Sequence, residues 1–381
     1  MLKLTADTVN SIDDFAHYCE PWNQLWENSN AYEPLSRCEG IQRWHQQFAA
    51  DEKFSAIMVW NGSQLVGALP LIHAQKSGVK LLKQPRNEWV NAGELLIHND
   101  FEVKDVVTFI IEELKTFPES ILCFDGVRFE SEAWATFIEQ VQAASGQTGV
   151  MQKETVGLIQ VGDDWDSYFQ SLSGNHRSTV RRAEKKARKS ADLTMLRMQD
   201  LTAEECETWM KRAFEVENRS WKRENGSSIL ASEGMASFFL DEAEIARKAG
   251  MLELWFLMLD EQPIAFEYCH RAKKVCLSYK IGYDEAFKRL APGKLLRKLQ
   301  LETLYRDAPG TILDTKGTLC PTKAKWATDT YPSGRLVVAL TGRVPKLLLN
   351  AYLQAKPIIQ KLRNVDTESP VIELGGANAF R

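Results

Sequence analysis

The sequence predicts an α/β (α+β) fold in which mixed central sheets are flanked by helices and two similar halves follow one another. Two observations predict it. β-rich runs separated by short polar turns occur in both halves of the chain, and each group of runs is followed by apolar residues at helical spacing. The length of 381 residues also suits two domains better than one.

The composition excludes several classes of protein. Hydrophobic residues make up 44% and charged residues 26% of the chain, which is enough for ordinary cores and excludes a largely disordered or fibrous protein. The net charge of -4, from 47 basic and 51 acidic residues, is not that of a polycation that coats nucleic acid. Any site for anions must therefore be local.

The cysteines and the apolar runs bear on the compartment. Seven cysteines are scattered without a C-x-x-C pair or a Cys/His cluster of zinc-binding spacing, so we expect reduced thiols and no metal site. The N-terminal residues lack a basic segment followed by an apolar one, and no run of about 18 apolar residues occurs. The sequence therefore predicts a cytoplasmic protein, neither secreted nor membrane-spanning.

The first half is expected to contain a hairpin, a helix and a strand. In residues 54–74, two β-rich runs flank Asn61-Gly62, a dipeptide that tolerates the positive φ angles of a tight turn. Residues 100–117 place apolar side chains at helical spacing, and residues 120–129 have the character of a buried strand. Strand, helix and strand in this order indicate an α/β layer.

The second half repeats this order. Residues 251–283 contain three β-rich runs separated by polar turns, and a helix is expected to start at Pro292. The segment from Gln64 resembles the segment from Gln262 in pattern, which indicates a weak internal duplication of one α/β unit.

The duplication sets the expected domain boundaries. The turn-rich seam lies near residues 150–170, so the predicted domains are 1–160 and 161–343. Residues 344–381 are expected to form a terminal helix, interrupted by Pro357, and a loose tail from residue 364. The helix combines leucines with lysines and arginines, so it either packs on the protein or makes a peripheral membrane contact.

Two basic segments are candidate anion sites. Residues 177–189 hold seven cations against one acid, and Arg177, Arg181 and Lys185 share one face of the predicted helix. Such a run is either a solvated face or the binding site of an anionic ligand. At the junction of strand and helix, Gly293 lets a phosphate approach a helix N-terminus, although a plain helix start gives the same sequence.

Several short segments follow one another in an order typical of one known family. They are Glu217 to Lys222, Pro263 to Ala265, Gly282 to Asp284, Ala291 to Leu296, and Asp314 to Gly317 followed by Lys323 to Trp326, with Trp22, Trp26, Gly67 to Leu71 and Gln84 to Asn87 in the first half. Together they resemble the CelD/BcsL-like acetyltransferases of the GNAT superfamily, which are related to the FemAB-like peptidyl transferases. The resemblance spans roughly residues 15 to 340.

The resemblance implies a tandem pair of GNAT folds with acetyl-CoA or another acyl-CoA as co-substrate. It places the donor site in the second half, at Arg289, Gly293, Lys294 and Leu295. The superfamily's pyrophosphate loop usually reads Arg/Gln-x-x-Gly-x-Gly/Ala. Here the glycine comes one residue late and Leu295 replaces the second small residue. Aminoacyl-tRNA, the donor of FemAB-like relatives, therefore stays as an alternative. The basic helix predicted at residues 177–189 would then bind the tRNA phosphates.

The implied reaction is attack of an amine on a thioester or ester carbonyl, which needs a base and a proton for the leaving group. Glu217 is the expected base and Asp314 the alternative, although either can be a surface or turn-capping residue. Tyr283, with Tyr279 as a second choice, is the expected proton donor unless it packs in the core. His270 is expected to be structural.

The remaining candidates concern the acceptor. Trp221 and Lys222 belong to the family-like segment, and Lys323 and Lys325 are expected to contact an anionic acceptor or a phosphate unless they are ordinary exposed lysines. The leading function is an acyl-CoA-dependent N-acyltransferase that acts on a small-molecule or saccharide amine, in exopolysaccharide or cell-envelope biosynthesis. The alternatives are the tRNA-dependent transferase and a non-catalytic polysaccharide-associated binding protein on the same scaffold.

Overall fold

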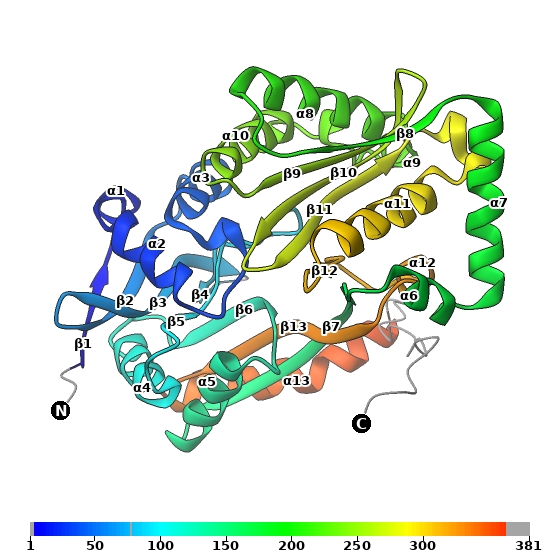
Figure 1. The fold of residues 1–381 in the computed structure, drawn as a ribbon. Helices are drawn as coiled ribbons and strands as arrows, with labels where there is room; N and C mark the ends of the chain where they lie inside the picture. The colour runs from blue at the N-terminus through cyan, green and yellow to red at the C-terminus, as the bar shows by residue number, and fades with distance from the viewer. Residues whose placement is uncertain (1–3, 77, 363–381) are drawn as a thin grey trace. The chain divides into compact units, whose positions relative to one another are not determined.

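Two groups of elements make up the chain in the computed structural model, which describes residues 4–76 and 78–362 (Figure 1). The first unit runs to Thr155 and resumes at Tyr331, and the second runs from Val156 to Thr330. The division into 1–160 and 161–343 stays a prediction about domains. The observed units differ from it because the last strand and the last helix belong to the first unit.

The first unit is a mixed sheet with helices. Its strands lie in the order β1-β2-β3-β4-β6-β13. The bounds of its strands and helices are β1 Leu4–Val9, α1 Ile12–Phe15, α2 Cys19–Glu27, α3 Cys38–Phe48, β2 Phe54–Asn61, β3 Gln64–Lys76, β4 Val79–Lys83, β5 Leu96–Ile97, α4 Val103–Leu114, β6 Ile121–Val127, α5 Glu132–Ala143, β13 Asp329–Ala339 and α13 Arg343–Leu362.

The hairpin predicted at 54–74 is confirmed as β2 and β3. Asn61 pairs with Gln64, and Gly62 takes a φ of 63°, which favours a residue without a Cβ. The predicted helix at 100–117 is α4, which packs against β1, β2 and β3. A Cβ on Gly67 would lie 2.1 Å from Val106 Cγ1, so glycine lets the helix approach the sheet closely.

The expectation of reduced cysteines is wrong for two of the seven. Cys19 and Cys38 form a disulfide with their Cα atoms 5.0 Å apart, at the starts of α2 and α3. Tertiary packing holds these two helix starts together. The Trp22 indole of α2, for example, donates to the Ser36 carbonyl just before α3, at 2.9 Å. The sequence separation of 19 residues gave no sign of this packing. Because of this disulfide, the cysteines no longer favour a reducing compartment.

The second unit has strand order β7-β12-β11-β10-β9-β8. Its elements are β7 Gln147–Gln160, which enters it from the first unit, α6 Trp165–Ser171, α7 Gly174–Ser190, β8 Leu193–Met198, α8 Ala203–Asn218, α9 Trp221–Glu224, α10 Met235–Lys248, β9 Leu252–Leu259, β10 Gln262–Ala272, β11 Val275–Tyr283, the 3-10 helix η4 Glu285–Leu290, α11 Pro292–Asp307, β12 Ile312–Asp314 and α12 Pro321–Ala324.

Helices cover both faces of this second sheet. α11 packs against β9, β10 and β11 on one face, where a continuous apolar core forms around Trp255, Leu295 and Leu296. α8 and α10 pack on the other, as Figure 1 shows. The mixed α/β fold with helices on the sheets is thus confirmed.

The same order of connections recurs in the two units. Apart from the elements inserted between them, four antiparallel strands, a helix and a parallel strand occur in the same order as β1-β2-β3-β4-α4-β6 and as β8-β9-β10-β11-α11-β12. The internal duplication read from the two hairpins therefore extends through a whole α/β unit.

The C-terminal helix differs from its prediction. α13 continues from Arg343 to Leu362 and is not interrupted at Pro357. A proline removes one backbone donor and strains the preceding turn, but a helix held by packing elsewhere can contain it. The tail predicted from residue 364 lies outside the described residues.

Candidate functional site

β11 and β12 separate in the middle of β11. The two parallel strands pair at Val275–Ile312, Cys276–Leu313 and Leu277–Asp314, where β12 ends. β11 continues to Tyr283 and stays paired with β10 on its other side. Within the described strands, one edge of residues 278–283 thus has no β12 partner. Such an edge offers backbone N–H and C=O groups to an extended ligand.

A β-bulge lies at the same point. Tyr268 pairs with Lys280 and Cys269 pairs with Ser278, so Tyr279 is the extra residue in β11. A bulge leaves its extra residue outside the ladder and re-aims side chains, and bulges are common beside active sites. Here it turns both Tyr279 and Lys280 toward the face covered by α8 and α10, since Tyr279 contacts His270 and Lys280 contacts Phe239.

The start of α11 lies beyond the end of β11. Ala291 takes a φ of 53° as the N-cap and Pro292 is the first helical residue. The nearest atom to a Cβ built on Gly293 would be Tyr283 Cδ1, at 3.8 Å, so packing leaves space beside this backbone. The first N–H groups of a helix lack intrahelical acceptors and favour anions. Unlike α4, which has Asp105 in its first turn, α11 has no acid there.

The other residues near the predicted donor site differ in exposure and in hydrogen bonding. Arg289 is exposed in η4 and its carbonyl accepts from Lys186 at 3.3 Å. Leu295 is fully buried in the core, which leaves only its backbone for a ligand. Tyr283 donates to Glu285 at 3.0 Å, and burial together with this hydrogen bond raises the pKa of its hydroxyl.

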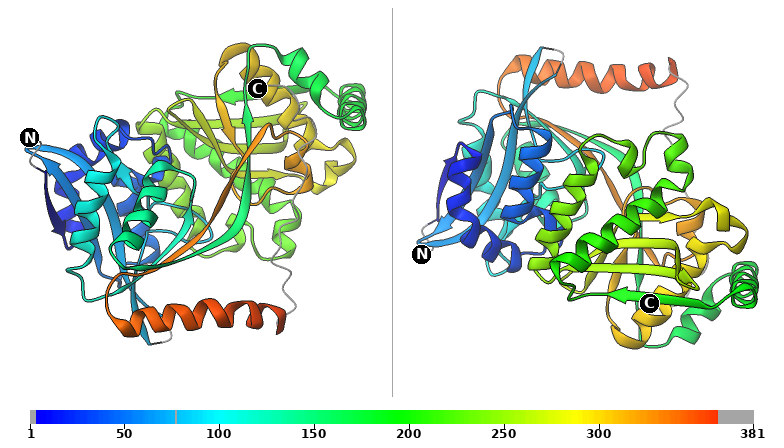
Figure 2. Two further views of the ribbon diagram at one scale, coloured as in Figure 1. Left: turned by 90° about the horizontal axis from the view of Figure 1, so that it is seen from below. Right: turned by 90° about the horizontal axis from the view of Figure 1, so that it is seen from above.

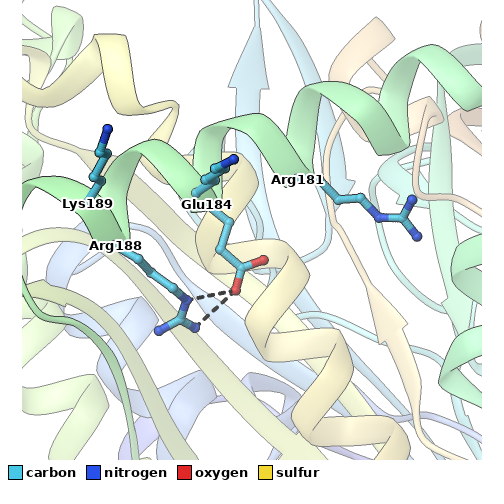
Figure 3. A pocket seen from close by; sticks show the side chains of 5 residues that line it. Arg181, Glu184, Arg188 and Lys189 are labelled. Carbon is cyan, nitrogen blue, oxygen red and sulfur yellow. Dashed lines mark hydrogen bonds and ion pairs between the residues drawn. The ribbon is translucent and has the colours of Figure 1, made fainter.

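The basic helix predicted at 177–189 is α7, and it lies against η4 and α11. Its single acid, Glu184, accepts from Arg188 at 3.0 Å and lies 3.3 Å from Lys298 of α11. Figure 3 shows Glu184 and Arg188 turned toward each other while Arg181 and Lys189 point away.

The other cations of α7 have no acidic partner among the described residues. Arg177 donates to Gln170, the Arg181 guanidinium lies 5.3 Å from the Phe169 ring, and Lys185 lines the shallow hollow of Figure 3. α7 therefore presents a positively charged surface beside the start of α11.

His176, in the first turn of α7, links this helix to two other segments. It is 4% exposed, its ring lies 4.5 Å from that of Trp326, and its Nε2 has no hydrogen-bond partner within the described chain. Burial, followed by the charges of Lys325 and Lys294, lowers its pKa to about 4. The starts of α7 and α11 and the segment after α12 thus place positive charges near one another.

Glu217 and Lys222, both predicted, come together. The Glu217 carboxylate is 1% exposed, at the end of α8. One oxygen accepts from Lys222 Nζ at 2.6 Å and the other from the Ile229 amide at 2.8 Å. Lys222 also donates to the Ile281 carbonyl of β11 at 3.0 Å. With both oxygens engaged, Glu217 suits the role of a positioning group that fixes Lys222 on β11.

Lys280 lies on the same face, and sequence reasoning missed it. Its ammonium is 4.7 Å from the Phe239 ring. Burial lowers the pKa of Lys280 to about 8. The negative charge of Glu217 opposes this shift, and the positive charge of Lys222 adds to it. No motif marked it, because a lysine in a strand is ordinarily a solvent-facing residue.

Glu242, Tyr268 and His270 form a buried group, each about 1% exposed. Tyr268 donates its hydroxyl hydrogen to Glu242 Oε2, and burial keeps its pKa well above the usual value. His270 Nε2 lies 2.7 Å from the Tyr268 oxygen and 2.8 Å from Glu242 Oε1. Both neighbours can accept, so this network assigns the ring proton to Nε2.

The other ring nitrogen is then an acceptor. His270 Nδ1 has no hydrogen-bond partner among the described residues, and neither has the Tyr279 hydroxyl, although both atoms are buried. The two rings lie 4.4 Å apart. A buried polar atom without a partner costs about 1 to 3 kcal/mol, so this pair is suited to a ligand or water. The expectation that His270 is a satisfied structural histidine therefore fails at Nδ1.

Asp314 stands where β12 ends and is fully buried. It is paired with Leu277, and directly paired residues point to the same face, which is the face of His270, the β10 partner of Leu277. Asp314 also accepts from the Lys316 amide at 2.9 Å, and Lys316 Nζ lies 4.9 Å from the Tyr279 ring.

The other acceptor candidates are not gathered here. Trp221 is 50% exposed at the start of α9. Lys323 donates to the Lys316 carbonyl, and Lys325 is exposed.

Comparisons with known proteins bear on the second unit and on the fold. The model of the acetyltransferase (GNAT) domain family matches residues 174–309, which lie within the second unit. A search of curated proteins finds no match.

Three solved structures are similar in fold. FemX has a TM-score of 0.59 at 10% identity, over 91% of this chain and 100% of its own. The C-terminal domain of an Agrobacterium fabrum protein, described provisionally as a lysylphosphatidylglycerol synthetase, has a TM-score of 0.53 at 10% identity, over 88% and 95%. L-PGS from Bacillus licheniformis has a TM-score of 0.51 at 10% identity, over 88% and 96%.

Proposed function

Because residues 174–309 match a GNAT-type acyltransferase domain, we propose that the protein transfers an acyl group from an activated donor to an amine. One observation carries the proposal. β11 leaves β12 after Leu277, directly before a bulge, and ends beside the Pro292-Gly293 helix start. This arrangement combines an edge for an extended chain with a helix N-terminus for phosphates.

The donor that we propose is acetyl-CoA or another acyl-CoA. The amide groups of its extended arm suit the open edge of residues 278–283. Its phosphates suit the backbone of Gly293, with the cations Arg289 and Lys294 beside them. The space next to Gly293 and the lack of an acid in the first turn of α11 support this assignment.

The reaction that we propose takes place on the face of His270. The amine attacks the carbonyl carbon, a C–N bond forms and the C–S bond of the thioester breaks. His270 Nδ1 accepts the amine proton, with Glu242 and Tyr268 holding the ring through Nε2. The Tyr279 hydroxyl supplies a proton to the leaving thiolate, and the proton that His270 took from the amine then restores the Tyr279 hydroxyl, since the two rings are 4.4 Å apart. Asp314 is the alternative base, because it lies at the end of β12 on the same face.

Aminoacyl-tRNA is the second candidate donor, and the cations of α7 favour it. From Arg177 to Lys189 they extend for about 18 Å at 1.5 Å per residue, longer than one pyrophosphate requires. The similar structures named FemX and lysylphosphatidylglycerol synthetase point the same way. With this donor the ester C–O bond breaks in place of C–S, and the proton goes to the tRNA hydroxyl.

The acceptor that we propose is an amino sugar or a saccharide amine of the cell envelope, as the family resemblance implies. The experiment incubates the full chain with labelled acetyl-CoA or with labelled bulk aminoacyl-tRNA, each with glucosamine and related amines. We expect a labelled amide with one donor. That donor at 100 times its dissociation constant should also stabilise the fold by about 2.7 kcal/mol.

The outcomes separate the candidates. Binding of tRNA through several phosphates weakens steeply with salt, whereas binding of CoA depends on fewer contacts. If neither donor stabilises the protein and no amide forms, the proposal fails. The alternative of a non-catalytic polysaccharide-associated binding protein is then favoured. If a donor stabilises the protein and is not consumed with any amine, the scaffold binds donors without the proposed transfer.

A further inference from the structure

α13 carries an unusual share of the exposed apolar surface. Among the described residues, seven large hydrophobic side chains are exposed, and four of them lie within nine residues of this helix. They are Val344 and Leu347 at 66% exposure, Leu348 at 45% and Tyr352 at 40%. Single exposed apolar residues are ordinary, but a contiguous group marks an interaction surface.

The opposite side of α13 is anchored to its own unit. Leu349 is 2% exposed and packs with Val337 and Ala339 of β13. Leu353 covers Gly149, where a Cβ would lie 2.8 Å from its Cδ2. In both views of Figure 2 one long side of α13, drawn in red, carries no other helix or strand of its unit. The exposed residues therefore belong to a fixed helix face.

The charge of the helix identifies the partner. α13 contains Arg343, Lys346, Lys356 and Lys361 and no acidic residue, in a chain whose net charge is -4. Residues 330–365 contain no Asp or Glu at all. A purely basic helix with an apolar face matches a surface that is anionic outside and apolar beneath, which is an anionic phospholipid bilayer.

The geometry distinguishes lying on a membrane from crossing it. None of the helices in the described ranges is long and apolar enough to span a bilayer. α13 has 20 residues, or about 30 Å, but one of its sides is occupied by β13. Only an orientation parallel to the surface exposes Leu347 and Leu348 to lipid while keeping Leu349 packed.

We propose that α13 holds this protein on anionic phospholipid membranes. Val344, Leu347 and Leu348 enter the headgroup boundary, and the exposed Arg343 faces lipid phosphates. The inference does not depend on the acyltransferase proposal, because α13 belongs to the first unit and the donor site to the second.

The test uses the full chain in vesicle flotation. Vesicles of phosphatidylcholine with phosphatidylglycerol are compared with vesicles of phosphatidylcholine alone, for wild type and for the double variant Leu347→Ser, Leu348→Ser. Leu230→Ser, which changes a leucine of similar exposure (47%) in the second unit, is the matched control. Arg343→Glu tests the charge. Unchanged melting temperatures establish that each variant is folded.

We expect wild type and Leu230→Ser to float with the anionic vesicles and not with the neutral ones. The double variant should bind at least about tenfold more weakly, and Arg343→Glu should lose part of the binding. No flotation of wild type overturns the proposal, and so does equal flotation of wild type and the double variant. If light scattering shows a wild-type dimer that the double variant abolishes, while neither floats, α13 is a self-association face and the proposal is also overturned.

Discussion

The two α/β units share their connections and differ at one strand. β4 ends at Lys83, which is also its last residue paired with the parallel strand β6. β11 is paired with β12 only as far as Leu277 and continues to Tyr283. An open strand edge thus follows the parallel pairing in the second unit and does not follow that of the described part of the first. The two units therefore share a scaffold, and the extension of β11 beyond β12 gives the second unit its candidate site.

The histidines of the two hairpins show the same contrast. His73 of β3 has both ring nitrogens engaged, with Ser55 Oγ at 2.9 Å and Glu119 Oε1 at 3.0 Å. His270 of β10 is engaged at Nε2, while its buried Nδ1 has no partner among the described residues. A satisfied ring stabilises a fold, whereas an oriented ring with a free acceptor is suited to proton transfer.

The largest effect is expected from changing the unsatisfied histidine. His270→Gln should lower turnover by about 10² to 10⁴, the usual contribution of a general base, with donor affinity nearly unchanged. His73→Gln is the control and should keep turnover within about threefold of wild type. Steady-state rates and donor dissociation constants measured on both variants check this. Equal rate losses in the two variants would mean that His270 acts only through stability.

The buried pair of Glu217 and Lys222 should affect folding more than catalysis. Glu217→Gln leaves the Lys222 ammonium without its counter-charge, so we expect a loss of about 2 to 3 kcal/mol in the free energy of unfolding. Glu215→Gln, at an exposed position of the same helix, should change it by less than about 0.5 kcal/mol. Urea unfolding measures both. If Glu217→Gln instead keeps its stability and loses turnover, Glu217 is the base, and Asp314→Asn then serves as the comparison.

The start of α11 should control donor affinity. Gly293→Asp puts a carboxylate where phosphates are expected, and we predict a loss of about 10- to 100-fold in donor affinity. Gly162→Asp is the matched control, because its Cβ also has open space, with Tyr305 Cε1 at 3.7 Å, near the other end of α11. Calorimetric titration of both variants decides the matter. Wild-type affinity in Gly293→Asp would remove the donor from this helix.

The smallest effect concerns pH. The pKa of His176 is about 4 in the folded protein and about 6.5 in the unfolded chain, so the unfolded chain binds more protons between these values. Stability is therefore full above pH 6.5 and is lost as the pH falls toward 4. From pH 7 to pH 4.5, wild type should lose about 1 to 2 kcal/mol more than His176→Leu. Urea unfolding of both proteins at the two pH values measures this; parallel losses would contradict the shift.

Local chemistry allowed part of this fold to be predicted. Asn61-Gly62 marks the first hairpin, and the spacing of apolar residues marks α4. Pro292 marks the start of α11 because proline suits the first turn of a helix. Glu217 and Lys222 were selected through a local segment and do lie together.

The rest depends on tertiary packing. Glu242 and His270 are far apart in sequence and meet because α10 packs on the sheet at β9, the strand next to β10. The bulge at Tyr279 adds a residue without disturbing a β-rich run, so the sequence pattern hides it. The Cys19–Cys38 disulfide likewise depends on how α2 meets α3.

The most direct measurement is amide hydrogen exchange of the full chain with and without saturating acetyl-CoA, repeated with aminoacyl-tRNA. We predict that the donor in use slows exchange at residues 278–283 and in the first turn of α11, and leaves the equivalent β3 and β4 amides unchanged. Protection confined to β3 and β4, or none at β11 while the donor is being consumed, would contradict it.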